Sequence, residues 1–335
     1  MNTKQQITLI LERAGDTCIS GSRLAETLGM SESTVRESIR QLSEDGYAVE
    51  CTERGYRLGQ QSDAISEDSV RSYLGEFSRA FELEVFSEID STNTYLKAKA
   101  VEAQHSGWRG GLKEWHTVIA SGQSAGRGRL GRSFCSPAGT GLYLSVLLRP
   151  AGTAESAVRI TTAAAVAACR AIESCTDACP QIKWVNDIFV RGKKACGILT
   201  EASVNMETGR LDWAVMGIGF NVYEPEGGFP EEIRDIAGAI AAQRQRDLRS
   251  RLAAAFLVEF QSLCRNLEGT DYHEEYRERS FLIGREINVL RGDMARPALA
   301  LDIDSDCHLI VRYEDGTTEA LSSGEVSVRA APPVP

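Results

Sequence analysis

A stretch of alternating glycine and arginine, SGQSAGRGRLGRSF at residues 121–134, constrains the fold of this chain more than any other feature. Gly126, Gly128 and Gly131 satisfy the pattern G-x-G-x-x-G, which in a dinucleotide-binding fold follows a strand and opens a helix. Here the stretch continues into SPAGTG and then into the apolar run LYLSVLL, which is typical of a strand. The sequence therefore argues against a dinucleotide-binding βαβ unit at this position.

The same stretch carries three arginines, Arg127, Arg129 and Arg132, between its glycines. Glycine allows close backbone approach and mobility, and the guanidinium fork matches phosphate or carboxylate oxygens. The alternative is a solvated basic turn. Three arginines among three glycines, in a chain whose formal net charge is −10, favour a flexible loop that binds an anion.

The overall charge excludes some classes of function. With 37 Lys and Arg against 47 Asp and Glu in 335 residues, the chain lacks the positive field of a generic nucleic-acid coat, although one small face could still read DNA. Its nine cysteines form no CxxC pair, which favours reduced thiols in a cytoplasmic protein. Its apolar runs fall far short of the roughly 18 residues that span a bilayer, so we expect no membrane segment.

Residues 1–62 have the pattern of a winged helix-turn-helix DNA-binding domain. Three helical segments, with a tight turn at Gly29, precede two short strands at 47–52 and 56–58. The inner faces of the first and third helices are formed by Ile7, Ile10, Leu11 and Ala14, and by Val35, Ile39 and Leu42. This layout predicts DNA contacts from the helix starts, the third helix and the wing, at Gly21, Ser22, Ser31, Ser33, Thr34, Arg36, Arg40 and Arg54.

The charge of this segment limits how it could bind DNA. Residues 1–60 hold seven Lys and Arg but nine Asp and Glu, a net of −2. One such module should bind DNA weakly, whereas a dimer that presents two helices to a palindrome can add two half-sites.

The rest of the chain divides into two further parts. A polar linker or exposed connection is expected at 59–68, followed by a mixed α/β domain over 66–281. Its strand-like runs are 83–89, 117–120, 142–148 and 214–217, and its helical runs are 155–174 and 245–267. Residues 282–335 consist of short strands and turns, including the hairpin signal Asp315-Gly316, and are expected to form a small β-barrel.

Two more segments carry residues suited to chemistry. In QIKWVNDIFVRGKKACGILTE, residues 181–201, a turn at 191–193 joins two strands and brings Lys183, Asp187 and Lys194 together. Lysines can offset the repulsion between a carboxylate and a polyphosphate, and aspartate can hold magnesium. In EIDSTNTYL, residues 88–96, Ser91, Thr92 and Asn93 are either helix caps or donors and acceptors for an uncharged polar ring.

In combination these motifs resemble a known family. STN, GQSAGRGRLGR, KWVND, KKACGILTE and GIGFN, in this order behind a winged helix, closely resemble the bifunctional biotin–protein ligases that also act as biotin operon repressors. The resemblance covers all three segments. It implies an α+β multidomain protein: an N-terminal winged helix-turn-helix, a central biotin/lipoate-ligase-like catalytic domain and a C-terminal SH3-like β-barrel.

The resemblance also implies an activity and its partners. Members of this family activate biotin with ATP, assisted by Mg²⁺, to biotinyl-5′-AMP and pyrophosphate. They transfer biotin to a lysine of the biotin carboxyl carrier protein of acetyl-CoA carboxylase. Biotinyl-AMP acts as corepressor, promotes dimerisation through the central sheet, and so allows a homodimer to bind operator DNA.

Matching motif to motif implies a role for each site residue. The ureido head of biotin would be held by Ser91, Thr92, Asn93 and Gln123, and the loop over biotin and the adenylate would contain Arg127, Gly128 and Arg129. Lys194 would contact the biotin carboxylate or the reacting phosphate. Lys183 and Asp187 would serve the nucleotide phosphates and the metal, and Asn221 would line the same pocket. The family usually has proline where Val185 stands, a change that removes no reacting group.

Two other functions stay open at this stage. A lipoate–protein ligase performs the same two steps on a related catalytic fold but lacks the winged helix. Thermal stabilisation by biotin and not by lipoate would separate the two enzymes. A ligand-sensing repressor without ligase activity is the second alternative, and the retained lysines and arginines argue against it.

The arginine–glycine stretch yields a first prediction. A mobile loop that closes over a water-sensitive mixed anhydride would protect it from hydrolysis. We therefore expect Arg127→Gly to release the adenylate into solution, which can be measured as adenylate affinity and retention. Unchanged affinity and retention would refute this role.

Overall fold

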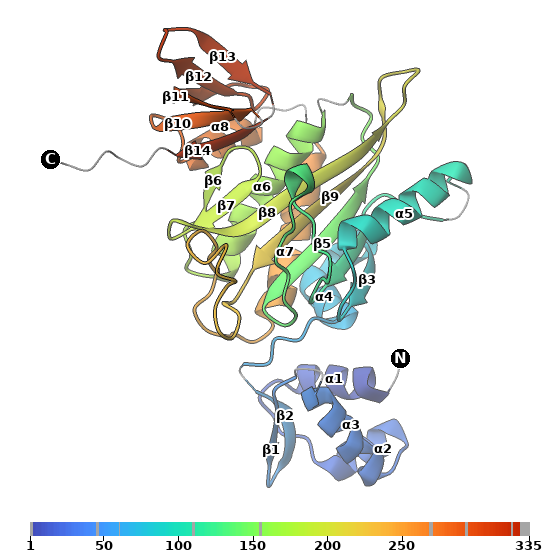
Figure 1. Cartoon of the computed structure of the whole chain (residues 1–335). Coiled ribbons are helices and arrows are strands. Elements are labelled where there is room, and N and C mark those ends of the chain that lie inside the picture. Colours follow the sequence, from blue (N-terminus) through green and yellow to red (C-terminus); the bar gives the residue numbers. More distant parts are fainter. Residues whose placement is uncertain are drawn as a thin grey trace, which may run out of the picture.

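The structure, a computed structural model, describes residues 3–44, 47–59, 61–108, 111–153, 156–267, 271–291, 294–322 and 324–328. Figure 1 shows three parts along the chain: a small helical unit at the N-terminal end, a large α/β domain in the middle, and an antiparallel sheet at the C-terminal end. The division expected from the sequence is therefore visible in the arrangement of the elements.

The N-terminal unit is a winged helix-turn-helix, as predicted. Its elements are α1 (Thr3–Ala14), α2 (Gly21–Leu28), α3 (Glu32–Glu44), and the antiparallel strands β1 (Val49–Thr52) and β2 (Gly55–Leu58). Ser20 caps α2 by accepting a hydrogen bond from the Arg23 amide, and Gly29 ends that helix with a φ of 64°. The predicted inner faces meet in one core, in which Ile7, Leu11 and Val35 are fully buried. The expected stop of the third helix near Gly46 lies outside the described residues.

The connection to the central domain, expected as a linker or an exposed segment, is only partly exposed: Gln61 is exposed, whereas Ser62 and Asp63 are buried. Asp63 is buried because its carboxylate pairs with Arg249 in α7 (Leu248–Cys264), whose backbone N–H and Nε donate to it at 2.9 and 3.2 Å. Tyr223 donates to the same carboxylate at 2.6 Å. Arg249 also donates to Ser121 Oγ at 2.8 Å and to the Gly141 carbonyl. A polar composition suggested exposure, but a partner 186 residues away lies against Asp63.

The central domain is built on a twisted, mostly antiparallel sheet. Within the described residues, seven strands form this sheet in the order β3-β4-β5-β9-β8-β7-β6, and β3 and β4 form its parallel pair. The strands are β3 (Glu82–Phe86), β4 (His116–Ala120), β5 (Gly141–Leu148), β6 (Gln181–Lys183), β7 (Asp187–Val190), β8 (Lys193–Val204) and β9 (Leu211–Asn221). All predicted strand runs of this domain are thus found in one sheet.

Helices cover both faces of this sheet. On one face, α6 (Ser156–Cys175) and α7 pack in a core with Leu144 and Val146 of β5. On the other face, α5 (Thr92–His105) packs with Leu147 of the same strand. Successive β5 side chains therefore enter different cores, which explains why this strand is a continuous apolar run. The short helices α4 (Glu67–Leu74) and η1 (Gly75–Ala80) precede β3.

The C-terminal part follows α8 (Asp271–Arg279). As far as the chain is described, it is a five-stranded antiparallel sheet in the order β13-β12-β11-β10-β14, consistent with the expected small β unit. The strands are β10 (Glu286–Arg291), β11 (Met294–Ile303), β12 (Leu309–Tyr313), β13 (Thr318–Leu321) and β14 (Glu325–Val328). The Trp184 indole N–H donates to the Cys307 carbonyl at 2.9 Å, which ties this sheet to the central domain.

Two expectations about the whole chain can be checked. All nine cysteines lie in described segments and are free thiols, and burial raises the pKa of Cys169 to about 12. None of the helices in the described segments is both long and apolar enough to cross a membrane.

The buried ion pair at the domain junction yields a stability prediction. The Asp63 and Arg249 side chains are 0% and 4% exposed, so Asp63→Asn would leave a buried guanidinium without its counter-charge. We expect a loss of about 3–5 kcal/mol in the free energy of unfolding, measured by urea titration. The control is Asp16→Asn, which removes the 70% exposed partner of Arg246 and should cost less than about 1 kcal/mol. Equal small losses in both variants would contradict this account.

Candidate active site

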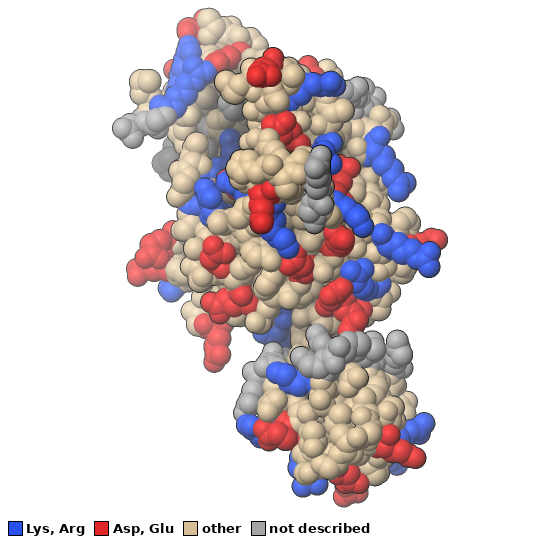
Figure 2. Space-filling model, turned by 90° about the vertical axis from the view of Figure 1, so that its right-hand side faces the viewer, with Lys and Arg blue, Asp and Glu red and all other residues tan. Residues whose placement is uncertain are grey.

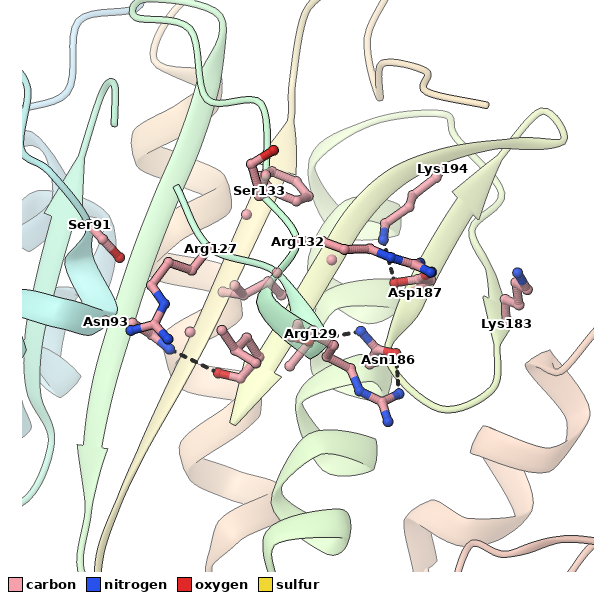
Figure 3. Close-up of a pocket in the computed structure, with 18 of the residues that line it drawn as sticks. Ser91, Asn93, Arg127, Arg129, Arg132, Ser133, Lys183, Asn186, Asp187 and Lys194 are labelled. Carbon is pink, nitrogen blue, oxygen red and sulfur yellow. Dashed lines mark hydrogen bonds and ion pairs between the residues drawn. The ribbon is translucent and has the colours of Figure 1, made fainter. Parts of the chain in front are cut away.

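A cleft on the α5 side of the central sheet collects most of the predicted site residues (Figure 3). They come from four separate segments: the start of α5, the arginine–glycine stretch, the β6–β7 turn and β8. The cleft is lined by Ser91, Thr92, Asn93, Gln123, Arg127, Gly128, Arg129, Lys183, Asp187 and Lys194, among others. Segments up to about 100 residues apart in sequence thus meet in one place.

The floor of the cleft is made of glycines on two neighbouring strands. Gly197 of β8 pairs with Gly219 of β9, and Gly217 lies two residues before Gly219. A Cβ on Gly219 would lie 2.6 Å from the Phe134 ring, and one on Gly217 would lie 1.9 Å from Asn93 Oδ1. The floor therefore has no room for side chains at these two positions. We did not predict this floor, although glycines inside a strand signal a close approach of another group.

The roof is a hairpin, residues 126–134, which we call the arginine–glycine hairpin. The Gly128 N–H donates to the Arg132 carbonyl at 2.7 Å, and the Phe134 N–H donates to the Gly126 carbonyl at 2.9 Å. Its tip is the short turn η2 (Arg129–Gly131), where Leu130 has a φ of 54°. Residues 135–140, all described, lead directly into β5 without a helix, which confirms that this is not a dinucleotide-binding turn.

The arginines of the hairpin reach different partners across the cleft. Arg129 donates to Asn186 Oδ1 at 3.0 Å, in the turn between β6 and β7. A terminal nitrogen of Arg127 lies 3.6 Å from Glu201 Oε1 on β8. Arg132 lines the cleft as well. Figure 3 shows Arg127 pointing toward Asn93, and Arg129 lying beside Asn186.

Neutral polar groups occupy the α5 end of the cleft. Gln123 Oε1 accepts hydrogen bonds from the Thr92 N–H at 2.9 Å and from the Thr92 hydroxyl at 3.2 Å. Ser145 Oγ lies 2.7 Å from Thr92 Oγ1 and 2.6 Å from Asn93 Oδ1, which can only accept a hydrogen bond from it. Ser91 caps α5 through the Thr94 N–H and also lines the cleft. The helix-cap interpretation of the Ser-Thr-Asn motif is therefore confirmed for Ser91, and all three residues line the cleft.

Cationic groups occupy the other end. Lys194 Nζ lies 2.6 Å from Asp187 Oδ1, and Lys183 is the cross-strand neighbour of Asp187. The pairing of Lys183, Asp187 and Lys194 on adjacent strands agrees with the hairpin predicted from the sequence. Val185, at the position where proline is usual, follows a cis peptide bond, and the flanking Trp184 and Asn186 line the cleft.

Asp187 is the candidate metal ligand, and its surroundings allow a limited test. Its Oδ1 is buried, and the Lys194 ammonium, 2.6 Å away, is its ion-pair partner. The described residues contain no group of three His, Cys, Asp or Glu side chains that could hold a metal ion. A single carboxylate fits Mg²⁺ only where substrate phosphates supply further ligands.

Other residues differ from the sequence-based set. Asn221 is not among the lining residues described for the cleft. It is buried at the end of β9, with its amide nitrogen 3.5 Å from the Lys194 carbonyl oxygen. Gly324 and Val326, next to and within β14, do line the cleft, so the C-terminal sheet closes one side of it. No local pattern in the sequence indicates that Gly324 and Val326 line the cleft, because their position depends on how two domains pack.

The predicted DNA-binding residues lie on the N-terminal unit. Gly21 and Ser22 begin α2, Ser31 accepts a hydrogen bond from the Thr34 N–H at the start of α3, and Ser33 lies 2.7 Å from the Ser31 hydroxyl. Arg36 and Arg54 are exposed. Arg40 makes two hydrogen bonds to Glu37, at 3.0 and 2.6 Å. Acidic and basic side chains are intermixed on the face of this unit seen in Figure 2, which agrees with its near-neutral charge.

Family models match three parts of the chain. Residues 3–57 match a helix-turn-helix domain, residues 85–221 match the biotin/lipoate A/B protein ligase family, and residues 282–329 match the biotin protein ligase C-terminal domain. The matches follow the same order as the three parts seen in the structure.

Relatives and a solved structure agree with these models. The bifunctional ligase/repressor BirA of Bacillus spizizenii is 34% identical over 239 residues, which cover 71% of this chain and 70% of that protein. The protein of the same name from Escherichia coli is 28% identical, with 93% of each chain covered. A variant of biotin protein ligase from Aquifex aeolicus, solved in complex with biotin, is 25% identical with a TM-score of 0.60, and the match covers 75% of this chain and 99% of that chain. The chain therefore belongs to the family of bifunctional ligase/repressor proteins named BirA, within the biotin/lipoate A/B protein ligases.

Proposed function

We propose that this chain activates biotin with ATP to biotinyl-5′-AMP and then transfers biotin to a lysine of a carrier protein. The observation that carries the proposal is the division of one cleft into two chemically distinct ends. Thr92, Asn93 and Gln123 offer neutral donors and acceptors, while Lys183 and Lys194 supply positive charge. A ureido ring needs the first end, and a carboxylate that meets a polyphosphate needs the second.

The neutral end favours biotin over lipoate. The lipoyl head is an apolar dithiolane, which makes no use of paired donors and acceptors. Thr92 and Asn93 are both nearly buried, and protein partners hold their polar groups in fixed positions. Such an end of the cleft suits a polar ring better than an apolar dithiolane.

In the first step, a biotin carboxylate oxygen forms a bond to the α-phosphorus of ATP, and the bond from that phosphorus to the pyrophosphate oxygen breaks. Two negatively charged groups must approach each other. Lys194, on the floor side of the cleft, is placed to lower this repulsion, and its pairing with Asp187 fixes the ammonium position before substrates arrive.

In the second step, the ε-amine of an acceptor lysine attacks the acyl carbon, AMP leaves with the bonding electron pair, and the amine loses a proton. Until that step, the mixed anhydride has to be shielded from water. The arginine–glycine hairpin lies over the glycine floor and is the part of this site suited to exclude water.

Magnesium fits this site in one specific way. Mg²⁺ would supply positive charge to the phosphates of the nucleotide, and the Asp187 carboxylate, which lines the cleft, would hold it together with those phosphates. Within the chain itself, Asp187 orients Lys194 and carries the counter-charge of its ammonium.

The proposed acceptor is the biotin carboxyl carrier protein of acetyl-CoA carboxylase. Gly324 and Val326 place the C-terminal sheet at the rim of the cleft, where a carrier domain would approach. We assign residues 1–62 to DNA binding, 66–281 to catalysis and 282–335 to the C-terminal module.

A homodimer with biotinyl-AMP as corepressor is the proposed form that binds operator DNA. β7 pairs with β8 only as far as Gly197, so within the described sheet the segment from Leu199 to Val204 has a strand partner on one side, β9. An open strand edge of this length can pair with its copy around a two-fold axis. Leu199 also lines the cleft, so ligand binding and dimer formation would involve the same strand.

The catalytic proposal is tested by biotin labelling of a carrier domain with ATP. Lys194→Met should lower the rate about 100-fold or more, the scale seen when a preorganised charge is removed. The matched control is Lys193→Met. The Lys193 ammonium donates to the Arg234 carbonyl at 3.0 Å, so this variant should keep the rate within about twofold of wild type. Labelling by wild type without ATP, or equal losses in both variants, would contradict the assignment.

The repressor proposal is tested by a gel shift with operator DNA. We expect binding that is sensitive to salt and that requires biotin and ATP together, because a weakly charged module needs a dimer to gain two half-sites. A shift that the two ligands together leave unchanged would count against a corepressor mechanism.

A further inference from the structure

Glu201, on β8 beside the cleft, has an unusual number of partners. Its carboxylate accepts hydrogen bonds from Lys97 Nζ at 2.6 Å and from Asn93 Nδ2 at 3.1 Å, and lies 3.6 Å from a terminal nitrogen of Arg127. Burial would raise its pKa, but the bonds from Lys97 and Asn93 and the charge of Arg127 lower it overall. The side chain, 19% exposed, is therefore a charged group held against Asn93 and Arg127, two residues that line the cleft.

The position of Glu201 joins the roof of the cleft to its neutral end. Gly197, Leu199 and Glu201 alternate along β8, so they share one face of the sheet. Asn93, which closes the α5 end, donates both to Glu201 and to the Leu199 carbonyl. Arg127 belongs to the hairpin that forms the roof. One carboxylate thus contacts a fixed part of the site and its covering loop.

We propose that Glu201 is a positioning residue that latches the arginine–glycine hairpin over the cleft through Arg127, and so retains the adenylate. This inference rests on the proposed ligase function. In it Arg127 acts by closing the roof, while Lys183 and Lys194 serve the phosphates. Asn93 gains a second function, because its amide keeps the latch carboxylate in place.

The contacts fit a latch that can open. The Arg127–Glu201 pair is long, at 3.6 Å, and the arginine side chain is 45% exposed, so its rupture costs little. When Arg127 moves away, Lys97 and Asn93 still donate hydrogen bonds to the carboxylate. Opening of the hairpin therefore does not leave a buried charge without a partner. A carboxylate with Arg127 as its sole partner would hold the hairpin more tightly and slow substrate entry.

The first experiment needs no ligand. Hydrogen exchange of residues 124–134 is measured in the full-length protein, in wild type, Glu201→Gln and Lys97→Met. Glutamine keeps a carbonyl acceptor for Asn93 but removes the charge that attracts Arg127, so we expect exchange about two- to fivefold faster, the factor that a partly exposed ion pair supports. Lys97→Met leaves the Glu201–Arg127 pair in place and should stay within about twofold of wild type.

The second experiment measures release of biotinyl-AMP formed on the enzyme. Glu201→Gln should release it about two- to fivefold faster than wild type and Lys97→Met should not. In a protein that already carries Arg127→Gln, adding Glu201→Gln should have no further effect, because both changes break the same contact.

The outcomes separate the latch from the ligase function. If Lys97→Met speeds hydrogen exchange and adenylate release as much as Glu201→Gln does, the cause is a general loss of structure. That result would overturn the latch. Additive effects of the Arg127 and Glu201 changes would overturn it as well. A wild type that retains the adenylate no better than Glu201→Gln overturns the latch alone, whereas a wild type that forms no adenylate overturns the proposed function.

Discussion

Repulsion between like charges is the constraint on which the rest of this site depends. The proposed reaction brings a carboxylate to a polyphosphate, so several cations must stand close together inside an acidic protein. The structure meets this need by giving cations of the cleft partners within the protein. Lys194 faces Asp187, Arg129 donates to Asn186, and Arg127 lies near Glu201. The overall charge of −10 does not weaken the site, because the local arrangement determines the field in the cleft.

The same cleft depends on close packing beneath and behind it. The glycine floor allows Phe134 and Asn93 to approach β9, and a single Cβ at Gly217 would displace Asn93. Behind the floor, Arg249 contacts Ser121, two residues before Gln123, and also holds Asp63 at the start of the central domain. The DNA-binding unit is thus attached to the chain segment that leads into the neutral end of the cleft.

Local signals in the sequence predicted much of this structure. The winged helix followed from helical spacing, serine caps and Gly29, and the β7–β8 hairpin followed from two apolar runs around a glycine turn. These features depend on neighbours a few residues apart. The convergence of Lys183, Asp187 and Lys194 could be predicted for the same reason, since one hairpin places all three.

The features that could not be predicted depend on distant partners. Asp63 is buried by Arg249, Asn93 is held by Glu201, and Gly324 reaches the cleft from another domain. A polar segment or a lone glutamate carries no sign of such a partner in its own neighbourhood. Asn221 is a residue for which the sequence suggested too much. Its motif, GIGFN, indicated a side chain that lines the cleft, but that side chain lies against the Lys194 carbonyl instead.

Release of pyrophosphate from ATP by the purified chain tests the central claim most directly. The account predicts release of about one equivalent per active site that requires biotin, because the biotin carboxylate is the group that displaces pyrophosphate. No release with both substrates present, or equal release when biotin is omitted, would contradict it.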